Sequence, residues 1–173
     1  MAISLYDISV ASSLQVLSGV SGFLEKGKQH CEENGIDPHD IVTTQLYDDM
    51  LPFQFQIVSV AHHSLGSVRG VMAGEFAPPG GPNELDYAGL QELIADAARD
   101  LEALDPDEVN SYDGKDVVFK IGGNELPFTA ENFVLSFSHP NLYFHAATAY
   151  DILRMKGVPL GKRDFMGRMR MNS

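Results

Sequence analysis

Apolar residues recur at helical spacing along most of this chain. From Leu5 to about Asn34 the pattern predicts one long helix, which Gly35 is placed to end. A second helix is predicted from Leu51 to about Ala73, and its two neighbouring apolar stripes are typical of a bundle helix packed on both sides. A proline- and glycine-rich stretch ends that helix. A third helix follows, with apolar residues at alternating steps of three and four: Tyr87, Leu90, Ile94, Ala97, Leu101 and Leu104.

The spacing changes in the second half of the chain. Two short runs, 117–121 and 125–128, surround a glycine-rich turn and predict a β-hairpin, in which Pro127 restricts its strand to the edge of a sheet. Thr129 can then cap a fourth long helix that continues through Met155.

A shorter helix is predicted at 39–46, because the preceding Asp37-Pro38 pair offers a cap and a first-turn proline. The pattern as a whole predicts one domain over residues 1–173. Its fold class is all-α: a four-helix bundle with a small β-hairpin before the last helix.

Composition and charge exclude several classes of partner but do not identify a reaction. Twenty-four acidic and twelve basic residues give the 173-residue chain a formal charge of −12, which argues against nucleic acid as a partner because phosphate binding needs a basic face. No apolar run approaches the ~20 residues of a membrane span, and the first residues do not resemble a signal peptide. The single cysteine, Cys31, excludes an internal disulfide and a cysteine-based zinc site. We therefore expect a reduced cytoplasmic protein.

Basic residues gather at the C-terminus of this acidic chain. Four of the twelve lie in the last dozen residues: Lys162, Arg163, Arg168 and Arg170. Such a segment could bind to the chain's own acidic body or to a second subunit, which would make a homodimer. A solvated, frayed end is the alternative, and the sequence leaves both open.

A row of polar residues lies within the apolar fourth helix. Ser138, Asn141, His145 and Thr148 share one face with Val134 and Ile152. Each buried polar side chain without a partner costs about 1–3 kcal/mol, so the row indicates contact with other polar groups, water or a ligand. Pro140 predicts a kink or a restart of the helix, which would leave backbone donors near Asn141 for an anionic or carbonyl-bearing ligand. A purely structural kink is the alternative.

Histidines point to the same region. His62 and His63 lie midway along the second helix, and His145 lies midway along the fourth. Imidazoles that two helices direct into one interior could hold a divalent metal, with one of the pair His62 and His63 and with His145 as ligands. A single histidine on an apolar face is more often a core residue, and the sequence does not decide which of His62 and His63 faces the interior.

At these residues the sequence resembles a known family. The run PNLYFHAATAYDILRMKGVPLGKRDF at 140–165, together with the DMLP and FQ segments at 49–52 and 55–56, is similar to an uncharacterised domain-of-unknown-function family of the DinB/YfiT-like four-helix-bundle metalloenzyme superfamily. The resemblance spans essentially the whole chain. It implies a four-helix bundle, often dimeric.

The resemblance also implies a metal site. In many members of that superfamily a histidine of the second helix and an H-x-x-x-H pair of the fourth hold a divalent metal such as zinc, nickel or manganese, and some members are transferases or isomerases that use small thiols. The second-helix histidine matches His63 or, by face, His62, and the last histidine of the pair matches His145. Position 141, where the first would stand, is Asn141.

Two functions remain open from the sequence. In the first, the chain is a small-molecule enzyme, in which His145 is a metal ligand or general base and Asn141 orients the substrate. The side chains available for substrate binding are Tyr143, Tyr150, Arg154, Ser138 and Thr148. In the second, the chain is a non-catalytic bundle without metal that binds a ligand or dimerises, and the polar row is an internal network.

Overall fold

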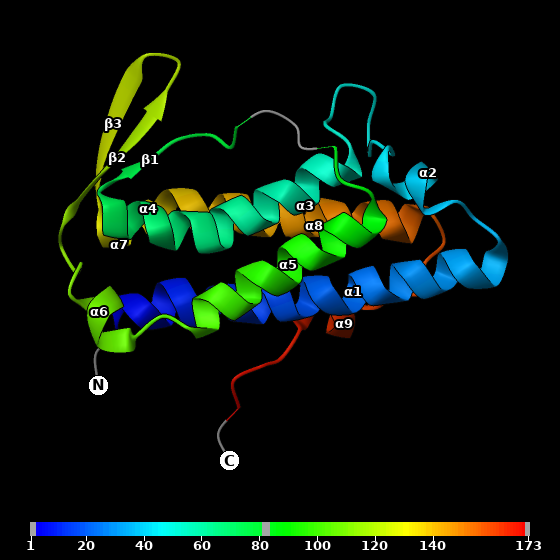
Figure 1. Ribbon diagram of the computed structural model, residues 1–173, viewed down its shortest axis with the longest axis horizontal. Coiled ribbons are helices and arrows are strands. Elements are labelled where there is room, and N and C mark those ends of the chain that lie inside the picture. Colours follow the sequence, from blue (N-terminus) through cyan, green and yellow to red (C-terminus); the bar gives the residue numbers. More distant parts are fainter. Residues whose placement is uncertain (1–2, 81–83, 172–173) are drawn as a thin grey trace.

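The computed structural model describes residues 3–80 and 84–171, and its long helices form a bundle (Figure 1). The first helix consists of η1 (Asp7–Ala11), a π-helical segment, and α1 (Ser12–Asn34); α5 (Tyr87–Glu102) is the third. The second and fourth helices each consist of three consecutive segments. These are α3 (Phe53–Ala61), η2 (His62–Gly66) and α4 (Ser67–Ala73), then α7 (Ala130–Phe133), η3 (Val134–Ser138) and α8 (His139–Met155).

The four helices pack around one core. α1 packs against α5 and α8, and α3 packs against the same two helices, so each helix has two neighbours in the bundle. Figure 1 shows α1 and α5 in one layer and α3, α4 and α8 in the other. Their fully buried side chains include Phe23, Ile57, Ile94 and Leu142, one from each helix. The predicted bundle is therefore confirmed, and within the described residues no helix is long and apolar enough to cross a bilayer.

A small sheet closes one end of the bundle. β2 (Asp116–Ile121) and β3 (Asn124–Thr129) form the predicted hairpin, with a two-residue turn at Gly122 and Gly123 whose φ angles are 55° and 80°. Both angles are positive, as the tight turns that suit strand twist require, and glycine adopts them without strain. β3 lies at the sheet edge, as Pro127 predicts. The sheet has a third strand, β1 (Glu75–Phe76), which pairs with β2 in parallel and was not predicted.

Short helices differ most from the prediction. α2 (Pro38–Val42) starts at its Asp37 cap as expected, but it ends four residues before the predicted end at 46. The second long helix starts at Phe53 rather than Leu51 because Pro52 provides its extended N-cap. α6 (Pro106–Asn110) and α9 (Lys162–Met166) were not predicted.

Three π-helical segments lie at one level of the bundle, since η1 contacts both η2 and η3. A π turn leaves a carbonyl without its normal helical partner, and such turns are common at functional sites. Here serine hydroxyls fill part of that need: Ser138 Oγ donates across the bundle to the carbonyl of His63 at 2.9 Å, and Ser67 Oγ donates to the same oxygen at 2.9 Å.

The fourth helix does not restart at Pro140. The backbone stays helical from Ala130 onwards through Pro140, and η3 ends at Ser138, two residues before this proline. The π turn accommodates the ring that would otherwise clash with the preceding turn. The predicted backbone donors of a helix start near Asn141 are therefore absent from the described helix, and that expectation is wrong.

The C-terminal segment lies on the protein's own α1. Lys26 pairs with Asp164 at 2.7 Å, Gln15 Nε2 donates to the Met166 carbonyl at 3.1 Å, and the backbone N–H of Arg168 donates to Ser18 Oγ at 3.2 Å. The approach is close, because a Cβ at Gly19 would lie 2.5 Å from the Phe165 carbonyl oxygen. In the structure, the described part of this C-terminal segment therefore binds the chain's own body and is not a frayed end.

Candidate functional site

Two imidazoles from opposite helices face one another where α3 and η2 pack against η3 and α8. The rings of His63 and His145 are nearly parallel, with an interplanar angle of 13° and centroids 5.9 Å apart. α3 and α8 run antiparallel, which brings the middle of the second helix against the middle of the fourth. Of the two histidines that the sequence left open, His63 is therefore the one whose ring lies against His145.

Gln56 fixes the tautomer of His145. Its Oε1 lies 2.8 Å from His145 Nδ1, and its Nε2 donates to the Leu51 carbonyl at 2.8 Å. Because the amide oxygen only accepts, Nδ1 of His145 carries the proton and Nε2 keeps its lone pair. A ring nitrogen held in this way by a second group is the arrangement found in metal-ligating and general-base histidines.

His63 has no hydrogen bond to either ring nitrogen among the described residues. Its side chain is 8% exposed, and Nδ1 is fully enclosed without a partner. Leaving a buried donor or acceptor without a partner costs about 1–3 kcal/mol. His139 Nε2 is in the same state, so the unpartnered nitrogen alone does not mark a site. At His63 it is combined with a second imidazole, that of His145, facing the ring.

Aromatic side chains form the walls around the pair. Phe76 of β1 and Phe137 of η3 each have ring centroids 5.7 Å from that of His63. Phe55 and Phe144 lie edge-on to His145 at 5.8 and 5.3 Å. These rings exclude water from much of the imidazole surface, which strengthens any electrostatic contact made there.

His62 lies beside the pair but is directed elsewhere. Its ring stacks on Phe76 at 4.4 Å, and its Nε2 donates to the Ala77 carbonyl at 2.9 Å, so Nδ1 keeps the lone pair. That nitrogen lies over Gly66, where a Cβ would come within 3.1 Å of it. His62 is therefore a neighbour of His63, at 5.3 Å between centroids, and faces the segment after β1 rather than His145.

Much of the polar row on the fourth helix is satisfied by main-chain carbonyls. Ser138 is bonded to His63 as described, Asn141 Nδ2 donates to Phe137 at 2.7 Å, and Thr148 Oγ1 donates to Phe144 at 2.8 Å. These bonds explain how the helix tolerates the polar side chains in its interior. Of these four residues only His145 uses a side-chain partner, Gln56. Asn141 stands one helical turn before His145 and keeps its Oδ1 as a second polar atom.

The remaining predicted substrate-binding residues are spread along α8. Tyr143 is 46% exposed and packs on His139. Tyr150 packs between Phe23 and Phe165, and Arg154 donates to the Val158 carbonyl at 3.2 Å beyond the end of the helix. Tyr150 and Arg154 are thus placed by contacts away from the imidazole pair.

Sequence reasoning did not assign a role to Gln56, although a signal was present. It lies in an apolar run, seven residues before His63, which places both side chains on one face of a helix. Gln56 is 2% exposed in the structure. A glutamine at a core position of a helix needs a polar partner, and here that partner is His145.

The donor set can be compared with what a divalent metal needs. His63 and His145 offer imidazole nitrogens, and Asn141, one turn before His145, offers Oδ1 because its Nδ2 is engaged. Among residues 3–80 and 84–171 no group of three or more His, Cys, Asp or Glu side chains gathers in one place. Two imidazoles and one amide oxygen fit a metal that keeps open coordination positions, with weaker binding than three imidazoles would give.

Burial keeps both imidazoles neutral. It lowers the pKa of His145 to about 4, and it lowers the pKa of His63 to about 3, with the neighbouring His62 and His145 contributing after burial. Burial also lowers the pKa values of His62 and His139. Neutral imidazole is the form that accepts a proton or ligates a metal.

These shifts predict a pH-dependent stability. The unfolded state takes up protons near pH 6.5 while the folded state does so only near 3–4, so stability is complete above about pH 6.5 and is lost as the pH falls towards 4. We expect the free energy of unfolding, measured in urea, to fall less from about pH 7 to about pH 5 in His63→Phe than in the natural chain. Exposed His39→Gln should behave like the natural chain. An equal fall in all three would contradict the buried, neutral state of His63.

Comparisons with known proteins agree with this architecture. The family described as Domain of unknown function (DUF1993) matches residues 5–166. The crystal structure of a DinB family member protein from Shewanella denitrificans is similar with a TM-score of 0.81 and 25% sequence identity, over 98% of this chain and 95% of that chain. No curated protein matches significantly. The resemblance stated from the sequence is confirmed, and the fold is DinB-like.

Proposed function

Because the chain belongs to the family described as Domain of unknown function (DUF1993) and has a DinB-like fold, we propose that it is a small-molecule enzyme with its site between the second and fourth helices. The observation that supports this most is the facing pair His63 and His145. Both rings are neutral, one is oriented by Gln56, and the other has a buried nitrogen without a partner. Lone pairs held in this state are suited to accept a proton or to bind a Lewis acid.

In this proposal three residues have different roles. His145 Nε2 faces away from Gln56 and accepts a proton or ligates a metal, and His63 supplies the second nitrogen. Asn141 Oδ1 orients the substrate or serves as the third ligand. A divalent metal bound by His63, His145 and Asn141 would polarise a substrate oxygen or lower the pKa of a bound water or thiol, which suits a transferase or isomerase.

Metal analysis tests this proposal. The natural chain, made without a histidine tag and loaded with zinc, nickel or manganese, should retain about one metal per chain after gel filtration, and His145→Ala should retain none because it removes one of two imidazoles. His39→Ala, an exposed histidine on α2, is the matched control and should retain the metal. Retention by His145→Ala would contradict the assigned ligands.

A metal-free ligand-binding bundle is the second candidate. It is favoured by the amide at position 141, which leaves no third imidazole or carboxylate among the described residues at the site. In that case none of the three metals is retained, and a panel of thiols and carboxylates raises the melting temperature of the natural chain but not that of His145→Ala.

The proposed homodimer would use the exposed apolar residues of η3 and α8, which are Leu135, Tyr143 and Phe144. Light scattering at micromolar concentration measures whether the dimer forms.

A further inference from the structure

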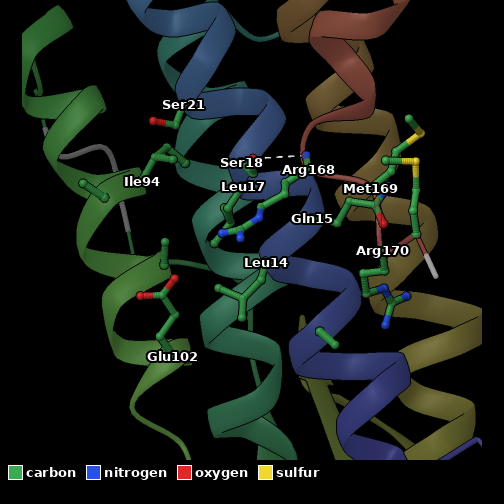
Figure 2. Close-up of a pocket in the computed structure, with 14 residues that line it drawn as sticks. Leu14, Gln15, Leu17, Ser18, Ser21, Ile94, Glu102, Arg168, Met169 and Arg170 are labelled. Atoms are coloured by element: carbon green, nitrogen blue, oxygen red, sulfur yellow. Dashed lines mark hydrogen bonds between the residues drawn. The ribbon is translucent and has the colours of Figure 1, made fainter. Parts of the chain in front are cut away.

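A cavity lies on the other layer of the bundle, between α1, α5 and the C-terminal segment (Figure 2). It has a volume of about 530 Å³, within the range of about 300–1,000 Å³ that is usual for small-molecule sites. It shares no lining residue with the pair His63 and His145. Binding of a ligand in this cavity would therefore be independent of the function proposed above.

The C-terminal segment forms one wall of this cavity. The bonds from Gln15 to Met166 and from Arg168 to Ser18 hold the segment against α1. Gly167, with φ of 60°, turns the chain where a Cβ would lie 2.5 Å from the Gln15 carbonyl oxygen. The residues after this turn, 168–171, thus line the cavity because the backbone is fixed just before them.

Arg168 brings an unpaired cation into the cavity. Figure 2 shows its side chain reaching across α1 towards the groove between α1 and α5, whereas Arg170 lies on the other side of α1 and contacts Ser12 Oγ at 3.3 Å. The guanidinium of Arg168 has no hydrogen bond or ion pair within the part of the chain that the structure describes. Arg168 is exposed to solvent at the edge of the cavity, so its guanidinium is available to an anion that enters from outside.

The rest of the lining is mostly hydrocarbon. Its apolar members come from both helices and the C-terminal segment: Leu14, Leu17, Ile94, Ala95, Ala98 and Met169. Ser18 and Ser21 add hydroxyls, and Glu102 adds a negative charge. Arg170 also lines the cavity, but its guanidinium lies on the other side of α1 and contacts Ser12. With Arg168 as the cation that reaches the groove, Glu102 nearby and a chain charge of −12, a monoanion is favoured over a phosphate dianion.

We propose that this cavity binds a small carboxylate with an apolar body. The planar guanidinium of Arg168 forms paired hydrogen bonds with the carboxylate, and the hydrocarbon part lies in the groove between α1 and α5. Leu17 and Ile94 are already buried, but the ligand would remove Leu14, Ala98 and Met169 from water, which favours binding.

Calorimetric titration with octanoate tests the proposal on the untagged full-length chain. We expect octanoate to bind, and Arg168→Gln to weaken it about tenfold or more by removing the charge-assisted bonds. 1-Octanol, which lacks the charge, should bind more weakly and respond little to this variant. Ala95→Phe, which fills the groove from an exposed position on α5, should weaken both ligands.

Arg99→Gln is the matched control, because it removes the same charge from α5 outside the cavity and should leave octanoate binding unchanged. The proposal is overturned if octanoate fails to bind in the millimolar range, if Arg99→Gln weakens it as much as Arg168→Gln, or if octylammonium binds as tightly. Should Ala95→Phe fail to fold, amide NMR shifts of the natural chain decide: octanoate must shift Ser18 and Ile94 rather than His63 and His145.

Discussion

Replacing Asn141 with histidine is expected to raise the affinity for zinc about 100-fold or more. Losing a residue that only hydrogen-bonds to a metal ligand typically changes metal affinity about 10–100-fold, and a ligand that binds the metal directly should have a larger effect. Asn141 lies on the same face as His145, one turn away, so the new imidazole would complete an H-x-x-x-H pair opposite His63. An imidazole nitrogen is a much better zinc donor than a neutral amide oxygen. Competition with a chromogenic chelator near pH 7.5 measures the change.

Two controls make this result specific. Asp151→His adds a histidine to an exposed position of the same helix and should leave the affinity unchanged. The double variant Asn141→His with His63→Phe should lose most of the gain, since the pair alone lacks its partner from η2. Unchanged affinity in folded Asn141→His would mean that His63 and His145 do not share a metal, and would favour the metal-free candidate.

The bundle could be predicted because its helices bury continuous stripes. Leu90, Ile94, Ala97 and Leu101 are each buried on α5, at the spacing that the sequence shows. β1 could not be predicted in this way. It has two residues, and it exists because Glu75 and Phe76 pair with Val118 and Phe119, more than forty positions along the chain. A strand that short has no periodicity of its own and depends on tertiary pairing.

The sequence located the candidate site between two helices but did not show which of its side chains contact one another. The sequence placed His145 and one of His62 and His63 together, and could not choose between the two because a π turn begins at His62. Such a turn inserts a residue into the helix, so the faces that a regular spacing predicts shift at that point. The sequence also could not show that Ser138 bonds to the His63 carbonyl, since that bond depends on how η2 and η3 meet.

One missed element did carry a readable signal. Asp105 and Pro106 begin α6 in the same way that Asp37 and Pro38 begin α2, with the aspartate side chain accepting from the first free backbone amides. The short helix at 39–46, by contrast, was predicted too long. Its last predicted turn offers only Leu46 to the core, since Thr43 and Gln45 are exposed, and the chain leaves the helix before it.

Replacing Phe133 with alanine is expected to lower the free energy of unfolding by about 3–5 kcal/mol, a large part of the about 5–15 kcal/mol typical of a domain. Phe133 is fully buried and contacts the rings of Phe76, Phe128 and Phe137, with centroids 5.1, 6.0 and 5.6 Å away. Truncation would remove these contacts and leave a cavity that the helix backbone cannot close. Urea unfolding measures the loss.

The same substitution should also affect the imidazole pair, because Phe76 and Phe137 are the rings that lie against His63. With Phe133 absent, both rings gain freedom and water can reach the buried nitrogen of His63. The pKa of His63 should therefore rise from about 3 towards its usual value, and NMR titration of the imidazole follows it. Phe144→Ala, the same truncation at a side chain that is 57% exposed, is the control and should cost less than about 1 kcal/mol. If Phe133→Ala destabilised the chain while the titration of His63 stayed unchanged, the aromatic cluster would be holding the sheet on the bundle without shaping the site.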